Sequence, residues 1–202
     1  MLVLWTSSQP DGVGQKPSVV AQQLKTRGIR LYSMAAGKKF SKDQALWSAS
    51  FAGYVYHTYN FKGENDVPSF GVPMANAVLE RRGQVRDIVF VLDTSSGANW
   101  NHMRAFVKNV VRSLDISPQG THIAMITFAD QSKTAFAFPK AGAPYDTAMV
   151  NRQIDAVTPI GGSGRNINLA LRGVTQLFTN SQYGSRPNSK KVNLWQFVKK
   201  IG

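Results

Sequence analysis

One stretch near the middle of the chain constrains the fold more than any other. Residues 87–97 read DIVFVLDTSSG, an apolar run that ends at Asp93 and continues into hydroxyl side chains and a glycine. A continuously apolar strand is typical of a parallel sheet that is covered on both faces. In open α/β sheets, ligand and metal sites form at the carboxyl ends of such strands. The stretch therefore predicts an α/β fold with a site at Asp93.

Strands and helices are expected to alternate along the chain. Apolar or alternating runs predict strands over 2–6, 29–34, 54–59, 87–92, 122–128, 133–138 and 190–195. Helical spacing of apolar residues predicts helices over 16–28, 43–50, 69–82, 103–114, 147–157 and 166–178. This order predicts a doubly wound, mostly parallel sheet with one antiparallel edge strand.

The stretch around Asp93 resembles the first strand of a von Willebrand factor A domain of the extracellular-matrix type, whose metal-ion-dependent adhesion site starts with Asp-x-Ser-x-Ser. Asp93 and Ser95 match the first two positions, and Gly97 replaces the second serine. The family's loop Gly-Gly-x-Gly-Thr-Asn-Ile reads GGSGRNI here, so Ser163 lies within it and Arg165 replaces the threonine. Ser7 falls where the family has a second aspartate. The resemblance implies a Rossmann-like fold and a degenerate site.

The family's cation is usually magnesium, which needs oxygen ligands in near-octahedral geometry. With three of the five positions altered, we expect no bound metal; if a cation binds, Asp93 and Ser95 are its candidate ligands. Two hypotheses remain open for Arg165. Its guanidinium either pairs with Asp93 in place of the metal or points to solvent from the glycine-rich loop.

The two halves of the chain stand in reverse order relative to the family. Residues 1–82 resemble the C-terminal half of one repeat, 83–192 resemble the N-terminal half of a following repeat, and 193–202 form a basic tail. Both a circular permutation and a junction of tandem repeats explain this order, and the two halves are expected to complete one domain. Residues 2–5 and 192–195 resemble two copies of the fourth strand; we favour 2–5 beside the Asp93 strand, because Asn193 interrupts the other copy. Halves that fail to pair internally would favour a domain-swapped homodimer.

The formal net charge of +13 indicates either an acidic partner or a solvated basic surface. The candidate basic surface comprises Arg81, Arg82, Arg86, Lys190 and Lys191. The chain has no cysteine, which excludes disulfides, and no apolar run near the roughly 20 residues that span a bilayer. Its apolar start lacks the basic leader and length of a signal peptide, so none is expected in this chain.

The resemblance implies a secreted, non-enzymatic adhesion module, as in matrilins, collagen VI and mollusc byssal or shell matrix proteins. Its expected partners are collagen or another matrix protein, and an acidic polymer such as a glycosaminoglycan. No nucleophile with a base, carboxylate pair or complete metal site indicates an enzyme. Two alternatives remain: an intracellular nucleic-acid-binding protein with this fold, and an incomplete gene product without independent function.

Overall fold

The fold is described from a computed structural model of the chain. It describes residues 2–6, 22–23, 26–27, 30–36, 55–58, 85–96 and 98–196. Within the expected helix over 16–28, residues 22, 23 and 26 are helical. The helices expected over 43–50 and 69–82 lie outside the described residues, as do Ser7, Arg81, Arg82 and Gly97.

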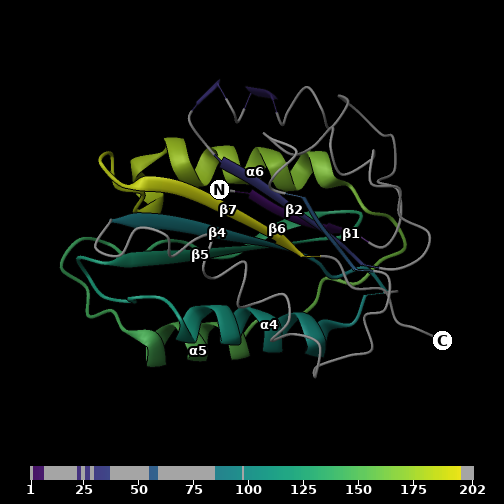
Figure 1. The fold of residues 1–202 in the computed structure, drawn as a ribbon, viewed down its shortest axis with the longest axis horizontal. Helices are drawn as coiled ribbons and strands as arrows, with labels where there is room; N and C mark the ends of the chain where they lie inside the picture. Colours follow the sequence, from purple (N-terminus) through teal and green to yellow (C-terminus); the bar gives the residue numbers. More distant parts are fainter. Residues whose placement is uncertain are drawn as a thin grey trace.

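The described strands form one seven-stranded sheet in the order β3-β2-β1-β7-β4-β5-β6 (Figure 1). The strands are β1 (Leu2–Thr6), β2 (Arg30–Ala36), β3 (Val55–Thr58), β4 (Arg86–Asp93), β5 (Thr121–Phe128), β6 (Ser132–Phe136) and β7 (Lys190–Gln196). All neighbouring pairs run parallel except β5 and β6, which are antiparallel. The predicted parallel sheet with one antiparallel edge strand is confirmed.

Helices cover both faces of the sheet (Figure 1). One face carries α6 (Ile167–Thr179), and the other carries α4 (Trp100–Arg112) and α5 (Thr147–Asp155). A short 3-10 helix, η3 (Ser181–Tyr183), follows α6. The side chains of Asn99, Asp146 and Asn166 cap the three α-helices by accepting a backbone N–H of the first turn.

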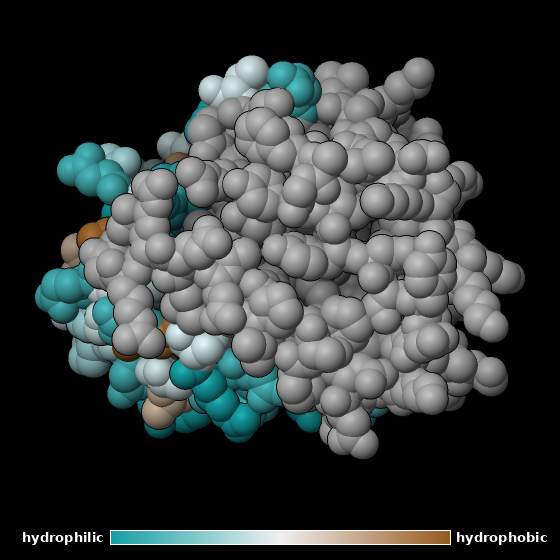
Figure 2. Space-filling view, in the orientation of Figure 1, coloured by the Kyte–Doolittle hydropathy of each residue, from teal (hydrophilic) through white to brown (hydrophobic). Residues whose placement is uncertain are grey.

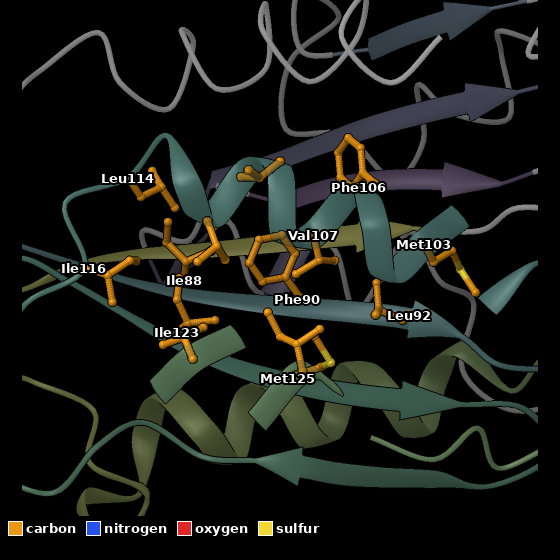
Figure 3. Close-up of a cluster of buried hydrophobic side chains, with 14 of the residues drawn as sticks. Ile88, Phe90, Leu92, Met103, Phe106, Val107, Leu114, Ile116, Ile123 and Met125 are labelled. Atoms are coloured by element: carbon orange, nitrogen blue, oxygen red, sulfur yellow. The ribbon is translucent and has the colours of Figure 1, made fainter. Parts of the chain in front are cut away.

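The alternation of side chains along β4 and β5 divides the core into two layers. Ile88, Phe90 and Leu92 of β4 pack toward α4 and α5, with Ile123 and Met125 of β5 beside them (Figure 3). The intervening residues of both strands, such as Val89 and Ala124, pack against α6. Burying a large apolar side chain contributes about 1.5–3 kcal/mol, so these layers fix β4 at the centre of the fold.

The strand beside β4 differs from the one we expected. The second copy of the fourth strand, β7, pairs with β4 over seven positions from Arg86↔Lys190 to Leu92↔Gln196. The first copy, β1, pairs with β2 and with β7 instead. A polar contact favours β7 at this place: Lys191 of β7 binds the buried Asp87 at the start of β4. Because β7 continues to Gln196, residues 193–196 belong to the strand and not to a basic tail.

Much of the visible surface over the described residues is hydrophilic, with a few apolar spots (Figure 2). Val85 and Ile160 are the large apolar side chains that the described residues expose. No helix in the described ranges has the length and apolar character needed to cross a bilayer.

Candidate functional site

Asp93 ends β4 at the carboxyl edge of the sheet and is only 2% exposed. Its Oδ1 accepts the backbone N–H of Ser95 at 2.9 Å, and its Oδ2 accepts Nε of Arg165 at 2.7 Å. The Arg165 side chain is itself mostly buried, with 19% of its surface exposed. Of the two hypotheses for Arg165, the ion pair with Asp93 is confirmed.

Burial raises the pKa of Asp93, because removal from water disfavours the charged carboxylate. The hydrogen bond from Ser95 and the charge of Arg165 act in the opposite direction without reversing the shift. A carboxylate in this position needs a cation close by, and the structure places the Arg165 guanidinium there.

Two loops meet at Asp93 and are joined by backbone hydrogen bonds. Thr94 O accepts the Gly161 N–H at 3.1 Å, while the Thr94 N–H donates to Phe128 O at the end of β5 at 2.8 Å. The Ser96 N–H and hydroxyl both donate to Gly162 O, at 2.8 and 2.9 Å. The loop after β4 is therefore hydrogen-bonded to the glycine-rich loop before α6. This arrangement places Arg165 beside Asp93.

Asp130 shapes the glycine-rich loop, a role that sequence reasoning missed. Its carboxylate accepts the backbone N–H of Ser163 at 3.0 Å and that of Gly164 at 2.8 Å. Gly162 adopts φ +108°, and a Cβ there would lie 2.1 Å from Asp130 Oδ2, so only glycine fits. The candidate residue Ser163 is exposed and lies in this loop. A lone aspartate in a turn gives no sequence signal for this role.

A second charged cluster, also missed from sequence, lies at the opposite end of β4. Asp87 is 0% exposed and accepts hydrogen bonds from Arg186 Nη2 at 2.7 Å, Ser189 Oγ at 2.5 Å and Lys191 Nζ at 3.0 Å. Burial acts to raise the pKa of Asp87, but the hydrogen bonds from Ser189 and Arg186 outweigh it and lower this pKa. The sequence did contain a signal for this cluster, because Asp87 is a charged residue at the start of an apolar strand.

The predicted basic surface is partly wrong. Arg86 is only 6% exposed, and burial lowers its pKa, so it is not a surface cation. Lys191 binds Asp87, and its side chain is 17% exposed. Lys190 is exposed, as predicted. The error arises because Arg86 and Lys191 flank the buried Asp87 on paired strands, which the sequence order does not show.

The sheet order, the two helical layers and the loop pair at Asp93 agree with a match to a protein-family model. The model of the von Willebrand factor type A domain matches residues 87–194, more than half of the chain. The chain belongs to this family. This von Willebrand factor A domain has the α/β fold that the sequence predicts, and Asp93 is the last residue of β4.

Individual relatives agree with this assignment. Von Willebrand factor of Rattus norvegicus is 30% identical over 116 residues, covering 56% of this chain and 26% of that protein. The collagen alpha-6(VI) chain of Homo sapiens is 26% identical over 174 residues, covering 85% of this chain and 7% of that protein. This A domain chain therefore spans about a quarter or less of these relatives.

A solved structure shows the same fold at low identity. An uncharacterized protein from Alicyclobacillus acidocaldarius matches with a TM-score of 0.55 and 14% identity, over 87% of this chain and 94% of that chain. Together, the family and its relatives make this A domain a homologue of extracellular matrix proteins, which implies a protein-interaction module.

Proposed function

We propose that this chain is a non-enzymatic binding module of the secreted extracellular matrix. Its recognition surface lies at the carboxyl ends of the strands, where Arg165 takes the place of the family's metal ion. The observation that carries the proposal is the 2.7 Å contact between Arg165 Nε and Asp93 Oδ2. A guanidinium that is always charged supplies the positive charge that the buried carboxylate needs.

The residues at this site do not fit magnesium. Both Asp93 oxygens already accept hydrogen bonds, one of them from a cation. Arg165 has no lone pair to offer where the family has a threonine hydroxyl, and Gly97 has no side-chain donor. Arg165 would also repel an incoming cation.

The proposed partner is collagen or another matrix protein, with acidic polymers such as glycosaminoglycans as a second class. The net charge of +13 favours partners that carry negative charge. Interactions between exposed charges are screened by salt, so binding to an acidic polymer should weaken as ionic strength rises.

The order of the halves is proposed to reflect consecutive repeats, with 1–82 as the back of one and 83–192 as the front of the next, together completing one domain. A match of 174 residues to the collagen alpha-6(VI) chain, covering 85% of this chain, supports this reading, because such an alignment follows the order of segments in both chains. A permutation confined to this chain would not give such a match.

Binding to a matrix ligand should not depend on divalent cations. When the chain is passed over immobilised collagen and immobilised heparin in a surface plasmon resonance assay, any affinity measured with Mg²⁺ should stay within about twofold when EDTA is added. The reason is that the positive charge at Asp93 belongs to Arg165 and is not removed by a chelator. Loss of binding in EDTA, restored by Mg²⁺, would contradict a metal-free surface. Binding to neither ligand would exclude collagen and heparin as partners.

A further inference from the structure

A hollow lies on the flank of the sheet between β6 and α5. Its volume is about 300 Å³, enough for one amino-acid side chain. The hollow is lined by residues of two strands and one helical segment. They are Thr127 of β5, Lys133, Ala135 and Phe136 of β6, Gln153 of α5, and Val157, which follows α5. The hollow shares none of these residues with the Asp93–Arg165 pair.

Two buried polar atoms of this lining lack hydrogen-bond partners. Thr127 is only 1% exposed, and its hydroxyl has no partner within the described ranges. The amide oxygen of Gln153 is also buried without a partner there. Leaving such groups unpaired costs stability, and a ligand that supplies the missing hydrogen bonds recovers that cost. A rotated Gln153 amide can offer its N–H instead of its oxygen.

Lys133 adds a positive charge to the same lining. It is exposed, and the described part of the chain gives it no ion pair or side-chain hydrogen bond. Its strand, β6, is the last in the sheet and has a strand neighbour, β5, on one side only among the described strands. An open edge strand accepts an extended segment of another protein through backbone hydrogen bonds. A second copy of this chain would bring a like charge against Lys133, whereas an acidic segment would neutralise it.

We propose that this hollow is a second binding site, which holds a carboxylate side chain of an acidic peptide extended along β6. That carboxylate would accept hydrogen bonds from the Lys133 ammonium at the rim and, once their buried polar groups rotate toward the hollow, from the Thr127 hydroxyl and the Gln153 amide. The apolar neighbours Ala135 and Val157 contact the methylene groups of the ligand's side chain.

The test is a titration of the ¹⁵N-labelled chain with a short peptide of alternating Glu and Thr, compared with a peptide in which Gln replaces Glu. The Glu peptide should give saturable amide shifts at Thr127, Lys133 and Gln153, and the Gln peptide should bind about tenfold more weakly. Lys133→Ala should weaken binding of the Glu peptide about tenfold, because a charged hydrogen bond is lost. Lys140→Ala, which removes an exposed lysine outside the lining, should change it less than twofold.

Thr127→Val separates a binding role from a structural one. It removes an unpaired buried hydroxyl at nearly constant volume, so the thermal midpoint should stay the same or rise while peptide binding weakens severalfold. A lower midpoint would overturn the proposal, because the hydroxyl would then already have a partner. Equal binding of the Glu and Gln peptides, equal effects of Lys133→Ala and Lys140→Ala, or an equal response to acetate alone would overturn it as well.

Discussion

Replacing Asp87 with alanine should lower the free energy of unfolding by about 3–5 kcal/mol. The carboxylate is 0% exposed and is bound by Arg186, Ser189 and Lys191. Its removal leaves two partly buried cations without their counter-charge and loosens the contact between β4 and β7. Urea denaturation followed by circular dichroism measures the loss.

Asp155→Ala is the matched control. Asp155 pairs with Lys108 at 2.8 Å, but its side chain is 48% exposed, so this pair should contribute about 0–1 kcal/mol. If the Asp87 and Asp155 variants lost similar amounts of stability, Asp87 would not be the residue that fixes β7 beside β4.

The Asp87 cluster also predicts how stability depends on pH. Its pKa in the folded chain lies below the ordinary value of 3.8, so the unfolded chain binds more protons between these two values. The stability that Asp87 contributes is therefore complete above pH 3.8 and is lost as the pH falls through the lowered pKa. Asp87→Asn should remove this part of the acid dependence. An unchanged acid transition in that variant would show that other carboxylates control it.

Arg165→Ala should be the second most damaging change, with a loss of about 2–4 kcal/mol near neutral pH. It removes the cation from Asp93, which is 2% exposed and whose pKa burial already raises. Without Arg165 that pKa should rise further. A protonated carboxyl needs no counter-ion, so the loss should shrink as the pH falls through the raised pKa. Urea denaturation at several pH values measures both effects.

Two comparisons isolate the ion pair. Arg172→Ala removes an exposed arginine of α6 and should change stability by less than about 0.5 kcal/mol. In a double-mutant cycle, Arg165→Ala should cost much less when Asp93 is already asparagine, because the charge that needed neutralising is gone. Additive losses in this cycle would mean that Arg165 and Asp93 do not stabilise each other.

The elements of the second half were predictable because their apolar residues follow the periods of strands and helices. The run ending at Asp93 predicts β4, and the spacing from Met103 to Val111 predicts α4; both are confirmed. The contact between Arg165 and Asp93 could be reached as one of two hypotheses, because the family's loop fixes which residue replaces the threonine. Short motifs in the sequence are enough to identify these elements and the position of Arg165.

The choice of strand beside β4 could not be predicted in this way. Apolar continuity favoured residues 2–5, yet β7 lies beside β4. The contacts that favour β7 join Asp87 to partners about a hundred residues further along the chain, among them Arg186 and Lys191. The burial of Arg86 and the hydrogen bonds from the glycine-rich loop to Asp130 also depend on residues that are distant in sequence, so local patterns did not reveal them.

Calorimetric titration of Mg²⁺ and Mn²⁺ into the unmodified chain tests the central claim, that Arg165 has replaced the metal ion at Asp93. The account predicts no binding heat up to millimolar concentrations of either cation, because Arg165 Nε already lies 2.7 Å from Asp93 Oδ2. Micromolar binding that disappears in Asp93→Ala would contradict it.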